Sequence, residues 1–216
     1  MTMLRIARII SVALFVTMMS GSNLLLGQVI KENRAVGSFA SIEVGGAFHV
    51  VLIQGDKYSV VVEADEDIIE RIETEVRGNE LRITQLGKIN DPGVLKVYVE
   101  FKDLERLDIS GAAEVESREL IKGRDLEVLV SGAGNVNLSY QGGSFEADIS
   151  GAGNYHAYDL PCQNLEIKTT GVGNARVLAS KKIKAYARGA GNISYRGDPE
   201  QVYADASGAG NIFRNP

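Results

Sequence analysis

The sequence is poor in the residues that most often carry chemistry. It has one cysteine, Cys162, two histidines, His49 and His156, and no tryptophan. A single cysteine excludes an intramolecular disulfide, so packing alone must stabilise the fold, and we expect Cys162 to be a small buried residue. The motifs G-x-S-x-G and H-E-x-x-H and paired cysteines are also absent, which removes the common patterns of hydrolases and zinc sites.

Basic residues are fewer than acidic ones. The 23 Lys and Arg face 28 Asp and Glu, which gives a formal net charge of −5. An acidic protein lacks the positive surface that binds nucleic acid, and this chain has no basic amphipathic helix for an anionic membrane. We therefore expect no nucleic-acid partner and no stable membrane insertion of the mature protein.

The first 27 residues have the pattern of a signal peptide. Arg5 and Arg8 precede the apolar run 9-IISVALFVTMMS-20, and a cleavage point follows Gly27. An uncleaved membrane anchor is the alternative, because the uncharged run is about long enough to span a bilayer. Cleavage would leave 21 basic residues against 28 acidic ones, a net charge of −7. We expect export to the periplasm, the cell surface or the medium.

Residues 30–104 alternate between apolar and polar side chains without a repeat. Stretch 65-DEDIIERIETEV-76 has an acidic start and apolar residues at 68, 69, 72 and 76, which predicts one short helix with Asp65 as its N-cap. The alternation predicts strands over the other apolar stretches of this part, at 42–44, 48–53, 58–64, 81–84 and 94–101.

Residues 105–216 repeat a glycine motif. Its best copies read SGAGN at 131–135, 150–154 and 207–211, and looser copies begin at 110, 170 and 188. The spacing of about twenty residues, with a strand on each side, predicts an all-β fold, a β-solenoid resembling a right-handed β-helix. A β-sandwich is the alternative. We expect residues 30–216 to form one continuous domain.

The motif glycines fall on the apolar parity of their strands. A glycine inside a strand costs about 0.5–1 kcal/mol relative to alanine, so a positive φ or a close backbone approach must explain their retention. The asparagines fall at equal places in successive coils and predict a hydrogen-bonded column. We expect corner and ladder roles, with no catalytic, cofactor or metal role, for Gly132, Gly134, Asn135, Gly151, Gly153, Asn154, Gly171, Gly173, Asn174, Gly189, Gly191, Asn192, Gly208, Gly210 and Asn211.

Other meanings of a glycine motif fit less well. A dinucleotide loop occurs once, between a strand and a helix, whereas this motif recurs between strands. A calcium repeat needs a carboxylate in each turn, but only Glu114 supplies one. Enzymes that cleave polysaccharides on β-solenoids line one face with acids and bases, and the candidates for that role here are Asp148, Lys168, Arg176 and Arg188. The histidines His49 and His156 lie on polar strand positions typical of solvated sheet residues.

The serial SGAGN motifs, with the lead-in 42-IEVGGAFHVVLIQGDKYSVVVEAD-65, resemble the head GIN domain of auto-transporter adhesins over residues 35–213. The resemblance implies an all-β, solenoid-like domain on an exported bacterial protein with an adhesive role, and it implies no catalytic residues. The sequence shows no heptad stalk, so we expect a free periplasmic or secreted protein, or one held by a partner.

The residues and the resemblance together predict an exported, non-enzymatic module that binds a glycan or a cell-surface protein through many weak contacts, without a cofactor. Two alternatives stay open. One is a structural or assembly protein of the cell envelope, in which the last coil, 207-SGAGNIFRNP-216, pairs with another copy to form a homo-oligomer. The other is a carbohydrate-active enzyme on a β-helix.

Overall fold

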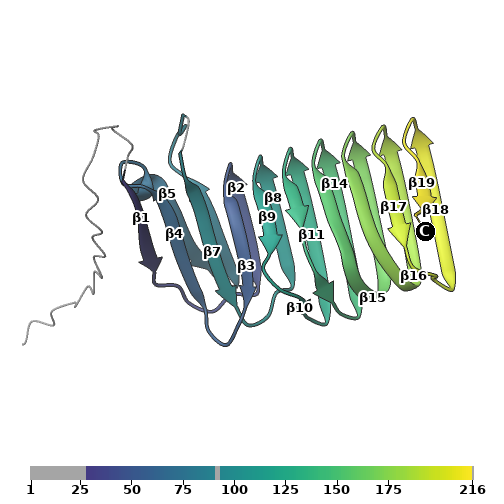
Figure 1. Ribbon diagram of the computed structural model, residues 1–216, viewed down its shortest axis with the longest axis horizontal. Helices are drawn as coiled ribbons and strands as arrows, with labels where there is room; N and C mark the ends of the chain where they lie inside the picture. The colour runs from purple at the N-terminus through teal and green to yellow at the C-terminus, as the bar shows by residue number, and fades with distance from the viewer. Residues whose placement is uncertain (1–27, 91–92, 216) are drawn as a thin grey trace, which may run out of the picture.

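The computed structural model describes residues 28–90 and 93–215, and this part of the chain winds into a stack of β-coils (Figure 1). Residues 1–27, to which the signal peptide was assigned, lie outside the described residues, as do residues 91–92 and 216 and the side chains of 158–161. The predicted all-β solenoid is confirmed: from residue 41 onward the successive coils pair in parallel register, whereas some pairs at the N-terminal end of the stack are antiparallel.

One long sheet, which we call face A, contains the strands that lead into the glycine motifs. Its strands run parallel from β6 to β18, and only the edge strand β5 is antiparallel to its neighbour. In spatial order they are β5 (Ile72–Arg77), β6 (Glu80–Gln85), β2 (Ser41–Gly46), β8 (Arg106–Gly111), β11 (Asp125–Gly132), β14 (Ser144–Gly151), the second halves of β15 (Asn154–Gly171) and β16 (Asn174–Gly189), and β18 (Gln201–Gly208).

A second sheet, face B, contains the strands that follow the glycine motifs and, at its N-terminal end, three strands of the part without a repeat. In spatial order they are β1 (Val29–Arg34), β4 (Ser59–Asp65), β7 (Leu95–Phe101), β3 (His49–Gln54), β9 (Glu114–Ser117), β12 (Asn135–Asn137), the first halves of β15 and β16, β17 (Ile193–Arg196) and β19 (Ile212–Arg214). A short parallel pair, β10 (Ile121–Lys122) and β13 (Tyr140–Gln141), closes the third side of the middle coils.

The core lies between the faces and is filled by the apolar parity of each strand. In β11 the buried residues are Leu126, Val128 and Val130, and their partners one coil later include Phe145 and Ile149. Because the register is parallel and unshifted, like side chains stack on like along the axis. The predicted inward parity is therefore confirmed for these coils.

The helix predicted at residues 65–76 is wrong. Strand β4 continues to Asp65, one 3-10 turn η1 (Ile69–Arg71) follows, and β5 begins at Ile72. The apolar spacing fits a helix, but β-branched residues alternate from Ile72 to Val76, and the tight turn before β6 lets β5 pair with it. Asp65 caps no helix; its carboxylate accepts a hydrogen bond from the backbone N–H of Gly93 at 3.2 Å.

The stack also includes part of the sequence that shows no repeat. Gly46 of β2 pairs with Gly111 of β8, and β3 pairs with β9, so residues 41–54 form a coil of the same kind. Within residues 28–90 and 93–215, no helix is long and apolar enough to cross a membrane.

Candidate functional site

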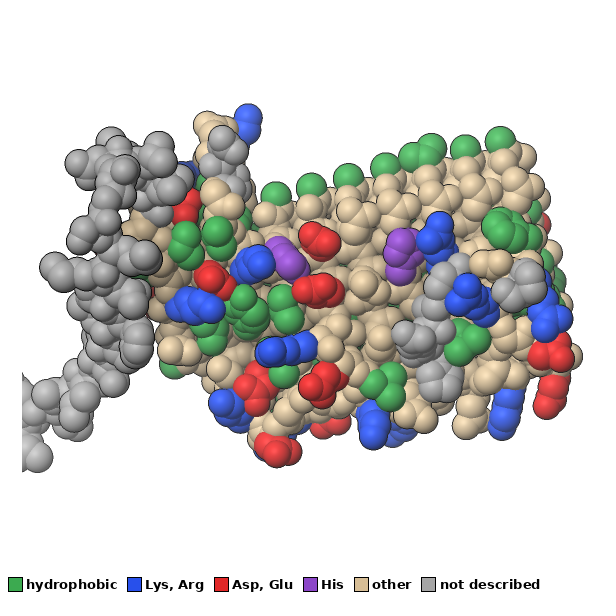
Figure 2. Space-filling model, in the orientation of Figure 1, with side chains coloured by type: hydrophobic (Ala, Val, Ile, Leu, Met, Phe, Trp, Pro, Cys, Tyr) green, Lys and Arg blue, Asp and Glu red, His purple; other side chains and the backbone are tan. Residues whose placement is uncertain are grey.

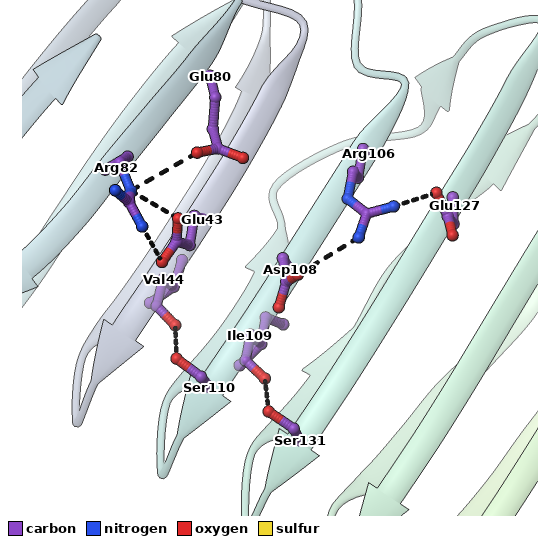
Figure 3. Close-up of polar contacts among 10 residues, drawn as sticks. All are labelled: Glu43, Val44, Glu80, Arg82, Arg106, Asp108, Ile109, Ser110, Glu127 and Ser131. Carbon is purple, nitrogen blue, oxygen red and sulfur yellow. Dashed lines mark hydrogen bonds and ion pairs between the residues drawn. The ribbon is translucent and has the colours of Figure 1, made fainter. Parts of the chain in front are cut away.

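The glycine motif forms the corner between face A and face B, and its serine bonds to the previous coil. Figure 3 shows Ser110 Oγ donating to the carbonyl of Val44 at 3.4 Å and Ser131 Oγ donating to that of Ile109 at 3.5 Å. Ser150 Oγ donates in the same way to the carbonyl of Val130 at 3.3 Å, so the hydroxyls of three successive corners tie one coil to the next.

The two motif glycines meet different constraints, as the corner at 150–154 shows. Gly151 has a φ of +108°, which side-chain-bearing residues rarely adopt, and an added Cβ would lie 2.3 Å from the carbonyl oxygen of Gly132. An added Cβ at Gly153 would lie 2.5 Å from the carbonyl oxygen of Gly134. Close stacking of backbone on backbone therefore requires glycine at both places.

The motif asparagines form a ladder along the edge of face B. Asn154 Nδ2 donates to Asn135 Oδ1 at 3.1 Å, and Asn174 Nδ2 donates to Asn154 Oδ1 at 3.3 Å. The same bond joins Asn192 to Asn174 at 3.1 Å and Asn211 to Asn192 at 3.4 Å. All four bonds run in one direction, so every amide is oriented alike. We call these five residues the asparagine ladder.

The residue between the two glycines lies at the tip of each corner. It is exposed in every copy, and its backbone N–H donates to a carbonyl of the previous coil, as Ala152 does to Gly132 at 2.8 Å. Figure 2 shows apolar side chains in a row along the upper edge of the stack, where the corners lie in Figure 1. The tip residues are Ala112, Ala133, Ala152, Val172, Ala190 and Ala209.

A second column of outward side chains runs beside the ladder on face B. Parallel register aligns Glu116, Asn137, His156, Arg176, Ser194 and Phe213 in consecutive coils. We call the part from Asn137 to Phe213 the flanking column. The two columns share a hollow of about 420 Å³, lined by Asn154, His156, Asn174, Ala175, Arg176, Asn192, Ser194 and Phe213.

The two histidines lie in different surroundings on face B. His49 Nε2 is 3.0 Å from Glu116 Oε1. His156 is exposed, 107 positions later, with Arg176 as its neighbour in the next coil. Partial burial, and next the charge of Arg176, lower the pKa of His156, so its ring is neutral at pH 7. Neither histidine lies beside a serine or cysteine nucleophile in its column.

Face A carries ion pairs that join one coil to the next. Arg82 reaches Glu43 through two hydrogen bonds of 2.6 and 2.9 Å, and Arg106 pairs with Glu127 (Figure 3). The hydrogen bonds from Arg82 lower the pKa of Glu43. The pair with Arg82 holds the Glu43 carboxylate in its ionised form, which suits a structural tie better than a general acid.

The ion pairs recur in the C-terminal half of face A. Lys168 Nζ lies 3.0 Å from both Glu146 Oε1 and Glu166 Oε1, and Lys184 Nζ lies 3.0 Å from Glu166 Oε2. The bonds from Lys168 and Lys184 lower the pKa of Glu166. On the last strands of face A, the rings of Tyr186 and Tyr203 pack with their centroids 5.5 Å apart.

The four catalytic candidates do not converge. Asp148, Lys168 and Arg188 line a hollow of about 240 Å³ on face A, together with Tyr186, whereas Arg176 lies on face B. Asp148 is the one carboxylate in the described lining of that hollow. Glycoside hydrolysis uses a pair of carboxyl groups across the scissile bond, and this hollow does not provide that pair.

Metal and thiol chemistry find little support in the described residues. Across residues 28–90 and 93–215, no group of three or more His, Cys, Asp or Glu is placed to hold a metal ion. Cys162 is buried, as expected, and burial raises its pKa to about 11, so the thiol is protonated and unreactive at neutral pH.

Sequence reasoning missed the carboxylate column of face A and the hollow on face B. Both can be found in the sequence once the coils are aligned on their glycine motifs. One column of face A contains the residue four positions before the first residue of each motif copy: Arg106, Glu127, Glu146, Glu166, Lys184 and Tyr203.

Comparisons with known proteins agree with this architecture. Among solved structures, one similar chain is described as a putative adhesin from Bacteroides fragilis NCTC 9343, with a TM-score of 0.71 and 22% identity over 87% of this chain and 97% of that one. Another is described as a putative lipid binding protein from Parabacteroides distasonis ATCC 8503, with a TM-score of 0.69 and 22% identity over 88% and 98% of the two chains. At these identities the likeness establishes the fold alone.

No match was found among curated proteins. The family model described as "Putative auto-transporter adhesin, head GIN domain" matches residues 38–199, which include five of the six motif copies and the lead-in strands. This chain therefore belongs to the family of head GIN domains of auto-transporter adhesins.

Proposed function

We propose that this protein is an exported, non-enzymatic binding module of the adhesive type, and that its ligand is an extended glycan of a cell surface. The observation that carries the proposal is the pair of outward columns on face B. They run unbroken across successive coils, and the ladder fixes the orientation of every amide. A long ligand can then make the same weak contact several times, and the contacts sum to useful affinity.

The family and the N-terminal pattern support export. The family is named for adhesins, and residues 1–27 carry the basic start, apolar run and cleavage point of a signal peptide. Expression of the full chain in a bacterial host tests this directly. The mature N-terminus should begin near Gln28 in the periplasm or the medium, and recovery of uncleaved chain in the cytoplasm would contradict it.

A binding screen tests the function. The purified mature chain is applied to an array of bacterial and host glycans, to isolated cell walls and to phospholipid vesicles. Vesicles are included because one structural relative is described as a lipid-binding protein. We expect saturable binding to a subset of glycans at micromolar concentrations, and no binding to any glycan or cell wall at high micromolar concentrations would overturn the proposal.

Assembly is the second candidate function, and the last coil favours it. All eight residues of β18 are exposed, including Val202, Ala204 and Ala206, which align with the buried Ile183, Ala185 and Ala187 of β16. A strand with an unpaired edge and core-side residues in solvent can accept a strand from a second copy. Light scattering from micromolar to millimolar concentration should then show dimers that Val202→Lys abolishes, whereas a monomer throughout would exclude this candidate.

A further inference from the structure

The hollow on face B combines one unopposed charge with ordered amides. From Asn135 to Asn211 in the ladder and from Asn137 to Phe213 in the flanking column, Arg176 carries the one permanent charge and no position holds a carboxylate. Figure 2 shows face B with its histidine side chains, one of them beside a basic side chain towards the C-terminal coils. A local positive charge on a protein of net charge −5 marks a place suited to an anion.

Arg176 differs from the arginines of face A in its surroundings. Arg82 and Arg106 are held by carboxylates of adjacent strands. No acidic side chain pairs with Arg176 among those that the structure describes. Its neighbours across the strands are His156 and Ser194. Its guanidinium therefore keeps its planar set of donors for a carboxylate or phosphate of a ligand.

The ladder supplies fixed hydrogen-bonding groups at the edge of the same hollow. Asn154 and Asn174 each donate one Nδ2–H to the preceding asparagine, and the second Nδ2–H of each amide takes no part in the ladder. The two amides are one strand spacing apart, about 4.8 Å. Because the ladder already orders these side chains, a ligand loses little affinity in immobilising them.

Phe213 adds an apolar wall to the hollow. The residue is 49% exposed and lies next to Ser194 in the flanking column. An inorganic anion has no surface that gains from this ring. Sugar units have an apolar face of C–H groups and an edge of hydroxyls, so one unit of a chain can pack on Phe213 while its neighbour hydrogen-bonds to the amides.

An acidic peptide fits this surface less well. Peptides usually bind a sheet by adding a strand to an open edge. Strands β15, β16 and β17 are paired with neighbours on both sides over the hollow, so their backbone groups are occupied. Recognition here has to use side chains, and a row of amides offers donors and acceptors of the kind that hydroxyl groups need.

We propose that this hollow binds an acidic polysaccharide, with Arg176 pairing to the carboxylate of one uronic acid unit, Asn154 and Asn174 bonding to hydroxyls of that unit, and Phe213, two strands further along, packing on a neighbouring unit. The inference rests on the proposed function as a glycan-binding module and names the class of glycan. His156 lies beside Arg176 as a neutral ring that can donate one further hydrogen bond.

Titration calorimetry of the mature chain with tetragalacturonate, and with the same oligosaccharide methyl-esterified, tests the charge requirement. We expect binding of the acid form and at least roughly tenfold weaker binding of the ester, as for the loss of one charge-assisted hydrogen bond. Arg176→Gln should lose roughly tenfold in affinity for the acid form and nothing for the ester. Phe213→Ala should weaken the binding of both the acid form and the ester.

Arg188→Gln is the matched control, because Arg188 is an exposed arginine of the same strand that lines the hollow on face A. An equal loss of affinity in both arginine variants, or equal binding of acid and ester, would overturn the site.

The class of ligand is tested separately with poly-glutamate. If poly-glutamate binds and Arg176→Gln abolishes this binding, while the oligosaccharide does not bind, the ligand is an acidic peptide and the sugar assignment is overturned. Neutral glycans binding without any uronate would overturn this inference alone, whereas failure of all glycans would overturn the proposed function with it.

Discussion

The side-chain amide of Asn174 donates to that of Asn154 at 3.3 Å, although the two residues are 20 positions apart in the chain. Asn174 Oδ1 also accepts from the Nδ2 and the backbone N–H of Asn192. We therefore expect Asn174→Ala to lower the free energy of unfolding by about 1–3 kcal/mol, because it leaves ladder groups on both sides unpaired. Urea unfolding monitored by circular dichroism measures the change.

The neighbouring Asn137 provides a control for that substitution. It is exposed in the flanking column, and no side-chain hydrogen bond of Asn137 is found among the described residues. Asn137→Ala should change the free energy of unfolding by less than about 0.5 kcal/mol. If the two substitutions cost the same, the ladder contributes nothing beyond an ordinary surface asparagine.

Substitutions of the motif glycines should follow the available space. An added Cβ at Gly191 would lie 2.1 Å from the carbonyl oxygen of Gly173, whereas one at Gly134 would lie 3.1 Å from that of Ala113. Backbone atoms of a packed coil cannot move aside singly, so Gly191→Ala should cost more than about 3 kcal/mol, and Gly134→Ala distinctly less. The melting temperatures of the two variants give the comparison.

Gly37→Ala serves as the reference for this pair, since Gly37 is exposed and an added Cβ would meet nothing within 4 Å. It should leave the melting temperature nearly unchanged. If Gly191→Ala yields no folded protein, Gly134→Ala should still fold, with a melting temperature below that of Gly37→Ala. Equal melting temperatures for all three would rule out close stacking of backbone as the reason for glycine.

Two tyrosines of this fold should respond oppositely to loss of their hydroxyl. Tyr155 is fully buried, and its hydroxyl has no hydrogen-bond partner among the described residues. Tyr98 Oη donates to Glu63 Oε2 at 2.7 Å. Tyr155→Phe should therefore raise the free energy of unfolding by about 1 kcal/mol, and Tyr98→Phe should lower it by a similar amount. Urea midpoints of both variants decide the signs.

Acid should lower the free energy of unfolding, in part because it protonates Glu166. Because hydrogen bonds from Lys168 and Lys184 lower its folded pKa below the ordinary 4.5, this group stabilises the protein above pH 4.5, and the contribution is lost as pH falls through the folded pKa. Glu166→Gln should be less stable than wild type at pH 7 and should approach it at pH 3. Urea midpoints at each pH measure the difference.

Glu73→Gln is the control for the acid series, because Glu73 is exposed on the edge strand β5 and forms no ion pair within the described part of the chain. Its stability should run parallel to that of wild type between pH 7 and pH 3. A gap between wild type and Glu166→Gln that persists unchanged at pH 3 would show that packing, and not ionisation, is what the substitution removes.

The repeat made most of this fold predictable. The motif spacing of about twenty residues predicts the length of a coil. The alternation of apolar and polar residues predicts which side chains point inward. Both patterns are visible in a short stretch of sequence. The error at residues 65–76 has a physical origin: the spacing of Ile68, Ile69, Ile72 and Val76 suits a helix face, and only the hairpin pairing with the following strand β6 selects a strand.

The site was less predictable because it depends on which residues become neighbours across coils. His156 and Arg176 are 20 positions apart and Phe213 is 37 positions further along, and nothing local to any of them indicates a common hollow. Register alone brings them together, and register can be read from the sequence only after the coils are aligned on their glycines. Strand β1, which pairs with β4 at the N-terminal end, lacks such an anchor and was not foreseen.

Every junction between coils from Gly111 to Gly208 uses the same glycine contact, with the added-Cβ distance to the preceding carbonyl between 2.3 and 2.7 Å. A junction of this kind does not depend on which two coils meet there. A coil can thus be duplicated or deleted whole without creating a contact of a new type, and each duplication lengthens the molecule by about 4.8 Å. The corner that holds the coils together also makes the length of the protein an adjustable quantity, in steps set by the hydrogen-bonding distance between two strands.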